Sequence, residues 1–317
     1  MTEPAINAKQ DRTIVDGIMA VAKREAEARK EGTAFYMSSA GKCVRALSYK
    51  EQNFLAAARG EPIPWESEPL SGRSLLVFQL GDLIEEALKV WLKKAFPDRF
   101  TPFEKGGSGG AVVKVGGKEV RGRLDGEFIE EDGEVSVVDI KSISPDGFNR
   151  VEKEGPESDH RAQMTSYMKA RGRKSARIIY YNKKNSALAE FKFFFESGAW
   201  ERIESDFRIV EAGELPPKPY EPAVEREWIQ GFKRLGERDA SVDIEGFTVG
   251  EVKKTGYYRE TGRRILEFPC SYCAFKVPCQ GPLHLEIIGG KPRFVVGEGG
   301  SAEEAEVALM RGLGEFE

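Results

Sequence analysis

The amino-acid sequence predicts an α/β fold, in which helices flank a central mixed sheet, because two kinds of hydrophobic pattern alternate along it. Segments with a helical spacing of apolar residues are separated by short runs rich in valine, isoleucine and aromatic residues, which are typical of strands. Of the 317 residues, 40% are hydrophobic and 32% are charged, a balance that supports a buried core and excludes a disordered chain. At this length we expect one large domain or two modest ones.

Helices are predicted where apolar residues recur every three or four positions. Residues 12–31 fit an amphipathic helix with a charged outer face, and a second helix is expected after Cys43 and through Ala58. Residues 74–96 predict a long helix with one buried stripe, formed by Leu76, Leu80, Leu83, Ile84, Ala87, Leu88, Trp91 and Leu92. The remaining predicted helices span residues 159–171, 198–212 and 223–237.

Strands are predicted in two pairs. Residues 120–129 and 135–143 flank the acidic segment 130–134 and predict a hairpin. Residues 176–181 and 188–195 predict a further pair around a turn at Asn185.

Four prolines follow the predicted helix 198–212 and mark a stiff boundary, at Pro216, Pro217, Pro219 and Pro222. The expected organisation is therefore an N-terminal helix, a core, a C-terminal segment that contains most of the cysteines, and an acidic tail. These four parts span residues 1–35, 36–215, 216–285 and 286–317.

The net charge of -4 excludes a generic polycation that coats nucleic acid, so any nucleic-acid site must be a local basic patch. Residues 161–184 supply one candidate, because they contain no acidic residue and the cations Arg161, Lys169, Arg171, Arg173, Lys174, Arg177, Lys183 and Lys184. No apolar run reaches the roughly 18 residues of a bilayer span, and the first residues are too polar for a signal peptide. We expect a soluble cytoplasmic protein with no membrane partner.

The predicted hairpin brings two carboxylates together. Side chains alternate between the faces of a strand, so Asp139 and Lys141 share one face of the second strand. If residues 131–133 make a three-residue turn with Gly133 in the left-handed conformation, Asp125 lies across from Asp139. Like charges in this position repel, which indicates that a cation, Lys141, or both lie between them.

The long helix offers a third acid. Glu85 lies at the edge of the apolar stripe, whereas Glu86 points further toward solvent. Oxygen ligands from Glu85, Asp125 and Asp139 suit Mg²⁺ or Mn²⁺, and a nearby lysine can help to orient or deprotonate a water. Together these groups predict metal-assisted phosphodiester hydrolysis. The alternative is that the acids are ordinary solvated side chains, with Lys141 as their salt-bridge partner.

The order of these residues resembles the PD-(D/E)XK nuclease superfamily, in which an acid on a helix precedes an acid on a strand and an acid-x-Lys on the next strand. The residues that match are Glu85, Asp125 and the sequence Asp139-Ile140-Lys141. Gln163 and Tyr167 are similar to the Gln-x-x-x-Tyr motif of the RecB-like branch, and at this spacing both lie on one helix face. The resemblance implies a restriction-endonuclease-like core.

The four cysteines extend the resemblance. Cys43 lies far from Cys270, Cys273 and Cys279, which fall within ten residues. This pattern looks like the iron-sulfur version of the nuclease, found in CRISPR-associated RecB-like exonucleases, AddB-type subunits and viral relatives. The resemblance implies that these cysteines hold a [4Fe-4S] cluster that closes the core through a C-terminal segment. Spacing alone also fits a structural Zn²⁺ ion.

The resemblance implies a divalent-metal-dependent DNA exonuclease of DNA processing, recombination or repair, in a bacterium or in a virus of a bacterial host. Asp125, Asp139, Glu85 and the carbonyl of Ile140 would bind the divalent cation, and Lys141 would position the attacking water. Substrate contacts would come from Gln163, Tyr167, Arg161 and Arg123. DNA with single strands or free ends is the expected partner, together with a helicase or recombination protein. A structure-specific or site-specific endonuclease and a catalytically silent DNA-binding or assembly module are the alternatives.

Overall fold

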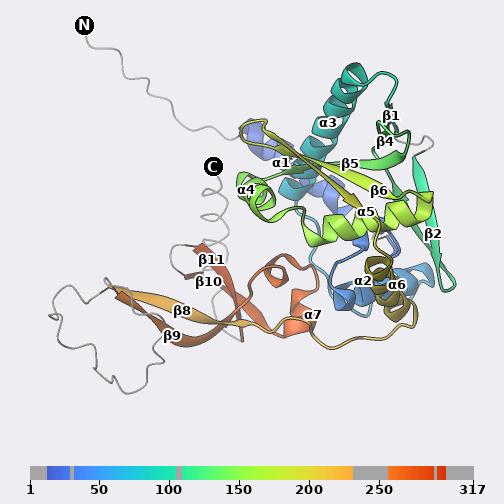
Figure 1. Cartoon of the computed structure of the whole chain (residues 1–317). Coiled ribbons are helices and arrows are strands. Elements are labelled where there is room, and N and C mark those ends of the chain that lie inside the picture. Colours follow the sequence, from blue (N-terminus) through green and yellow to red (C-terminus); the bar gives the residue numbers. More distant parts are fainter. Residues whose placement is uncertain (1–12, 29–31, 105–108, 231–255, 289–290, 298–317) are drawn as a thin grey trace, which may run out of the picture. The chain divides into compact units, whose positions relative to one another are not determined.

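A computed structural model describes residues 13–28, 32–104, 109–230, 256–288 and 291–297 of the chain (Figure 1). The chain divides into two compact units. The first comprises residues 1–64 and 69–217, and the second comprises residues 65–68 and 218–317. Among the described residues, none of the helices combines the length and the apolar character that a bilayer span requires.

The first unit is built on a five-stranded mixed sheet, as the sequence predicts. The strands lie in the order β1-β4-β5-β6-β7; β5 and β6 run parallel, and the other neighbours are antiparallel. The bounds are β1 Phe100–Pro102, β4 Gly126–Ile129, β5 Val135–Ile143, β6 Ser175–Asn182 and β7 Leu188–Phe194. A separate hairpin pairs β2 (Gly110–Val115) with β3 (Lys118–Arg123).

Helices cover both faces of this sheet. On one face, Val137 and Ile178 belong to the main core with Met164 and Met168 of α5. On the other face, Val138 forms a smaller cluster against which Leu92 of α3 packs. The helices of this unit are α1 Thr13–Glu27, α2 Val44–Ala58, α3 Gly72–Ala95, α4 Pro145–Glu154, α5 Ser158–Arg171 and α6 Ser197–Glu211, with a 3-10 turn at Met37–Ser39.

The predicted strand 120–129 is wrong as one element, because β3 ends at Arg123 and β4 begins at Gly126. The backbone changes partners between them. The amide of Leu124 donates to the carbonyl of Gly109, whereas the carbonyl of Asp125 accepts from the amide of Phe103. The chain therefore passes from the two-stranded hairpin to the central sheet, and this break places Asp125 directly before β4.

The prediction of one buried apolar stripe along α3 is also wrong. Leu83 and Trp91 are 69% and 65% exposed, and Leu80 is also exposed. The buried face of the second half of the helix instead contains Lys89, which is 3% exposed. The helix thus buries Lys89 as well as packing Leu92 against the sheet, and this orientation determines which of its acids can reach Asp125.

The second unit contains a four-stranded antiparallel sheet in the order β10-β11-β9-β8. Its strands are β8 Ala223–Gln230, β9 Gly256–Ile265, β10 Leu283–Ile288 and β11 Lys291–Val296, with a 3-10 turn η3 at Cys270–Tyr272 and a short helix α7 at Lys276–Gln280. The predicted helix 223–237 is therefore wrong over residues 223–230, where β8 pairs with a strand far along the chain. Residues 231–237 and 298–317 lie outside the described residues.

Candidate active site

The hairpin that carries the two aspartates has the predicted register. Gly126 pairs with Val138 and Ile129 with Val135, so continuing the same register places Asp125 opposite Asp139. The turn closes where the amide of Glu130 donates to the carbonyl of Glu134 over 2.8 Å, and Gly133 has a φ of 84°. The left-handed conformation is accessible to glycine without steric cost. The three-residue turn predicted from the sequence is confirmed.

Asp125, Asp139 and Lys141 form the centre of the site. Nζ of Lys141 lies 2.7 Å from Oδ2 of Asp139, as expected for residues on one face of β5. Oδ2 of Asp125 accepts a 2.7 Å hydrogen bond from the backbone amide of Ile140, between these two residues. Both carboxylates are buried, with exposures of 5% for Asp125 and 2% for Asp139. Sequence periodicity and turn chemistry were thus sufficient to place these groups together.

The helix α3 adds Glu85 through a lysine that the sequence analysis did not include. Nζ of Lys89 lies 2.5 Å from Oε1 of Glu85 and 3.9 Å from Oδ1 of Asp125. The same ammonium donates to the carbonyl oxygen of Phe103 over 3.0 Å. The side chain of Glu85 is 15% exposed and that of Glu86 is 49% exposed, which confirms Glu85 as the inward acid. The spacing of Glu85 and Lys89, four residues apart, was the available signal.

Glu85, Asp125 and Asp139 together are called the acid cluster here. Negative charges on these side chains make each further ionisation within the cluster unfavourable. Burial raises the pKa of Asp125 well above its usual range, and the charges of Asp139 and Glu85 raise it further. For Lys141 burial is the largest effect and acts to lower the pKa, but the attraction of Asp139 outweighs it and the pKa is raised. The lysine is therefore charged at neutral pH, and the cluster attracts a cation.

The fit of the acid cluster to a divalent cation rests on the chemistry of its donor atoms. The Lys141 ammonium, 2.7 Å away, is the positive partner of the buried Oδ2 of Asp139. The ligand atoms of Glu85, Asp125 and Asp139 do not all lie within 4.8 Å of one another, a distance that among the described residues the group at the start of α5 meets. Carboxylate oxygens are the ligands that Mg²⁺ and Mn²⁺ prefer. Glu85, Asp125 and Asp139 are the residues that would hold the ion.

Gln163 and Tyr167 lie inside the protein and contact each other. Nε2 of Gln163 donates to the Tyr167 hydroxyl over 2.9 Å, and this hydroxyl donates to the carbonyl oxygen of Arg123 over 2.7 Å. Tyr167 is 2% exposed, and burial raises its pKa, so the hydroxyl stays protonated as a donor. The described contacts of this pair thus hold the backbone two residues before Asp125.

Gly122 allows this tyrosine to come close. A Cβ atom at Gly122 would lie 2.6 Å from Cε1 of Tyr167 and 2.8 Å from Sδ of Met37, closer than packed atoms can approach. The β3 backbone, Tyr167 and Met37 therefore pack together only because residue 122 has no side chain.

Much of the predicted basic patch is neutralised by acids. Arg171 and Arg173 both pair with Glu127, at 3.3 Å and 3.0 Å. Lys174 pairs with Glu134, and Arg177 pairs with Glu130 and Glu190. Arg161 is exposed at the start of α5, and Arg123 is half-buried with an Nε atom that makes no hydrogen bond to the described residues. Four cations of the candidate patch thus have acidic partners, which the sequence does not show because it does not reveal which acids lie opposite.

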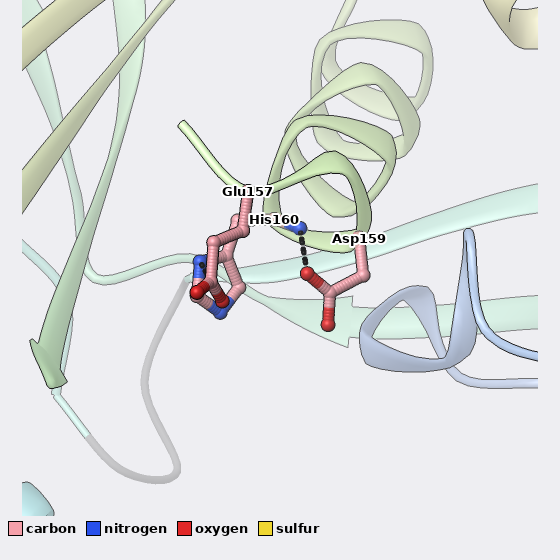
Figure 2. Close-up of side chains that lie close together, drawn as sticks. All are labelled: Glu157, Asp159 and His160. Carbon is pink, nitrogen blue, oxygen red and sulfur yellow. Dashed lines mark hydrogen bonds and ion pairs between the residues drawn. The ribbon is translucent and has the colours of Figure 1, made fainter. Parts of the chain in front are cut away.

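A second group of potential ligands lies at the start of α5. Glu157, Asp159 and His160 place one ligand atom each within 4.8 Å of one another (Figure 2). Nδ1 of His160 lies 2.9 Å from the Tyr180 hydroxyl, and Glu157 forms an ion pair with Arg150 at 2.5 Å. Burial lowers the pKa of His160, and the charge of Lys141 lowers it further. Protein partners therefore already engage these groups.

The cysteines are divided between the two units. Cys43 precedes α2 in the first unit, and Cys270, Cys273 and Cys279 lie in or beside η3 and α7 of the second. All four are partly exposed. Among the described residues, only the group at the start of α5 places three possible metal-ligand atoms within 4.8 Å of one another. The sulfur atoms of Cys270, Cys273 and Cys279 therefore do not all lie within this distance.

Comparisons with known proteins identify the family of the chain. The family model of the PD-(D/E)XK nuclease superfamily matches residues 20–280. The chain therefore belongs to the PD-(D/E)XK nuclease superfamily. No curated protein sequence matches it.

Solved structures similar to the chain include the protein SSO0001, with 18% identity and a TM-score of 0.41 over 63% of this chain and 86% of that one. An alkaline exonuclease from Laribacter hongkongensis, LHK-Exo, has 14% identity and a TM-score of 0.36 over 62% of this chain and 91% of that one. LHK-Exo in complex with dAMP has 14% identity and a TM-score of 0.37 over 57% and 91% of the two chains.

Proposed function

We propose that this chain is a divalent-metal-dependent nuclease that hydrolyses phosphodiester bonds in DNA, and that it acts as an exonuclease. The observation that carries the proposal is the hairpin that holds Asp125 and Asp139 beside the Lys141 ammonium, with Glu85 joined to Asp125 through Lys89. A buried group of acids next to a charged lysine is costly for the metal-free fold, and metal-assisted hydrolysis gives it a use. Family membership supports the nuclease reaction, and the exonuclease mode rests on the resemblance of the sequence motifs.

Each residue has a role that its position allows. Asp125, Asp139 and Glu85, with the carbonyl of Ile140 as a further ligand, would hold Mg²⁺ or Mn²⁺. When bound, the ion would lower the pKa of a coordinated water and offset negative charge on the phosphate. Lys141 would hold the attacking water or a phosphate oxygen by donating hydrogen bonds from Nζ. The ion pair with Asp139 keeps this ammonium charged and directed at the acids.

The substrate strand would follow cations that acids do not neutralise. Arg161 is exposed on α5, the helix that also carries Gln163 and Tyr167, and Arg123 precedes Asp125 by two residues. Gln163 and Tyr167 would act indirectly, by fixing the backbone at Arg123. DNA with single strands or free ends is the proposed substrate, and a helicase or recombination protein is the proposed partner. Binding should weaken steeply as salt concentration rises.

Cys43, Cys270, Cys273 and Cys279 would bind a [4Fe-4S] cluster of the RecB-like type. Four thiolates around one zinc ion lie about 3.8 Å apart, given a Zn-S bond of about 2.3 Å and tetrahedral angles. In a [4Fe-4S] cluster each thiolate binds a different iron, so the sulfurs lie farther apart. The choice of the cluster over zinc rests on the resemblance of the cysteine pattern to the iron-sulfur branch. Iron and zinc analysis of anaerobically purified protein, with its absorbance spectrum, tests this; a colourless protein with one zinc ion would refute it.

A DNA digestion panel tests the nuclease proposal. Linear and circular DNA, each single-stranded and double-stranded, are incubated with Mg²⁺ or Mn²⁺ and the wild type, Lys141→Ala or Lys174→Ala. Lys174 is the matched control, because its ion pair with Glu134 is on the surface. An exonuclease degrades only DNA with ends, and we expect Lys141→Ala to lose at least ~100-fold of this activity while Lys174→Ala keeps it.

The other outcomes of the panel are equally definite. Cleavage of circles would replace the exonuclease with an endonuclease. Binding of DNA without any metal-dependent cleavage would indicate a catalytically silent DNA-binding or assembly module. Equal activity of the wild type and Lys141→Ala, at matched circular dichroism spectra, would refute the role of the acid cluster.

A further inference from the structure

One face of α3 presents an apolar stripe to solvent. At about 100° per residue its members fall within an arc of about 100°, and they are Leu76, Leu80, Leu83, Ala87, Val90 and Trp91. Leu83 and Trp91 are 69% and 65% exposed, and Val90 and Leu80 are 53% and 47% exposed. Soluble proteins rarely leave a continuous row of large apolar side chains in water, so the stripe marks an interaction surface.

The spacing of the stripe fits a second helix. Positions 76, 80, 83, 87, 90 and 94 follow one another in alternating steps of four and three residues, which is the spacing of the seam between two paired helices. The last position is Lys94, whose ammonium lies 5.0 Å from the centroid of the Trp91 ring and forms no ion pair with a described acid. The seam therefore ends in a cation.

An acidic pocket lies beside the middle of the stripe. It has a volume of about 610 Å³ and is lined by Leu83, Gln79, Asp82, Glu86 and Glu104. Three carboxylates at its wall favour a positive group from outside. The α3 helix itself offers such a group on the same face, because Lys94 follows Leu83 by eleven residues, about 16 Å along the axis.

We propose that α3 pairs in antiparallel orientation with α3 of a second copy of this chain, so that Lys94 of each copy enters the acidic pocket of the other. A two-fold axis makes this contact reciprocal, since the same surface serves on both copies. The small side chain of Ala87 then lies opposite Val90 of the second copy. Parallel pairing would instead bring the two Lys94 ammonium groups together, and like charges repel. Antiparallel pairing also opposes the two helix dipoles.

The size of the stripe meets what a stable dimer needs. The exposed parts of Leu80, Leu83, Val90 and Trp91 amount to roughly 500 Å² in each copy, near the upper end of what a monomer leaves exposed in one patch. Two copies would bury about 1,000 Å², the area at which a specific interface begins. The ion pairs of Lys94 with the pocket lie at the rim and fix the register.

Sedimentation equilibrium of the full chain, at concentrations from about 1 to 100 μM, measures the dimer dissociation constant. The proteins compared are the wild type, Leu83→Glu, Lys94→Glu and Leu188→Glu. Leu188 is the matched control, because it is 57% exposed and lies on β7, outside the stripe. We expect dimers of the wild type and Leu188→Glu and monomers of Leu83→Glu, which would bury an unpaired carboxylate. Lys94→Glu should raise the dissociation constant by at least about tenfold.

Photo-crosslinking identifies what covers the stripe. Benzoylphenylalanine replaces Trp91, and chains labelled with ¹⁴N and ¹⁵N are mixed before irradiation. We expect crosslinked peptides that contain both labels and join position 91 to residues 80–94 of the other copy. Crosslinks within a single chain would overturn the inference, and so would a wild type that is monomeric or trimeric throughout the concentration range, or a folded Leu83→Glu protein that still dimerises. The crosslinking result decides the question even if Leu83→Glu does not fold.

Discussion

Glu130 is the acid whose contribution to stability can be worked out most directly from the structure. Its carboxylate accepts two hydrogen bonds from Arg177, at 2.8 Å and 2.7 Å, and one from Ser136 at 2.5 Å. Nζ of Lys192 lies 3.1 Å from the same carboxylate. Glu130 is 7% exposed and directly follows β4, the strand that pairs with β5 and brings Asp125 to Asp139. The substitution Glu130→Gln keeps the shape of this side chain and removes its charge.

The size of the effect follows from the pKa. The hydrogen bond from Arg177 is the main cause that lowers the pKa of Glu130 from 4.5 to about 2. This shift corresponds to about 3 kcal/mol of stabilisation by the charged form, at 1.36 kcal/mol for each pKa unit. Side chains of Arg177 and Lys192 are 22% and 32% exposed, so solvent screening reduces the value. We expect Glu130→Gln to lower the free energy of unfolding by about 2 kcal/mol at pH 7.

The pH dependence has a definite sign. A carboxyl whose pKa is lower in the folded state stabilises the protein above its unfolded pKa, and this stabilisation is lost as pH falls through the folded value. For Glu130 the loss occurs between about pH 4.5 and pH 2. The difference between the wild type and Glu130→Gln should therefore shrink over this range, because both carry a neutral side chain at its lower end.

Urea unfolding followed by circular dichroism, at pH values from 7 down to 2.5, measures this difference. The control is Glu134→Gln, whose partner Lys174 is 77% exposed, so its cost should stay below about 1 kcal/mol at every pH. The reasoning is refuted if Glu130→Gln costs no more than Glu134→Gln at pH 7, or if its cost is the same at pH 7 and pH 2.5.

Two further predictions concern the site itself. Gly122→Ala should lower the free energy of unfolding by about 1–3 kcal/mol, because the new Cβ would collide with Tyr167 and Met37; thermal unfolding against the exposed control Gly110→Ala, where a new Cβ meets no atom within 4 Å, measures it. Asp125→Asn should stabilise the metal-free protein, because burial and neighbouring acids raise the pKa of this carboxyl. Because the pKa of Asp125 is raised in the folded state, the metal-free wild type should lose stability as the pH rises through this pKa. Equal unfolding temperatures of both proteins at pH 8 would contradict this.

The centre of the site could be predicted because its geometry is local. A strand repeats every two residues, so Asp139 and Lys141 had to share a face. The glycine at the end of an acidic turn fixed the register that places Asp125 opposite Asp139. These rules depend only on residues within one hairpin, which is why no knowledge of the rest of the chain was needed.

The orientation of α3 could not be predicted in the same way. Helical periodicity shows that apolar residues share a face, but it does not show whether that face contacts the sheet. Here the second half of the helix buries Lys89 and leaves Leu83 and Trp91 exposed. The prediction of a helix at β8 was wrong for a related reason, because the pairing of β8 with β9 joins residues that are 26 to 42 positions apart, from Gln230 with Gly256 to Ala223 with Ile265. Long-range contacts decided both outcomes against the local pattern.

The burial of Lys89 explains how the fold tolerates its own acid cluster. Three carboxylates of one site cannot all be buried in a metal-free protein without a compensating charge. A helix that turned its apolar face to the sheet would carry Lys89 away from Asp125 and leave that aspartate with Lys141 as its nearest cation. The protein instead exposes Leu83 and Trp91 of α3 and buries Lys89 within reach of Asp125. Exposure of the leucine and tryptophan side chains costs free energy. The same orientation of α3 places the positive charge of Lys89 beside the negative charges of the acid cluster.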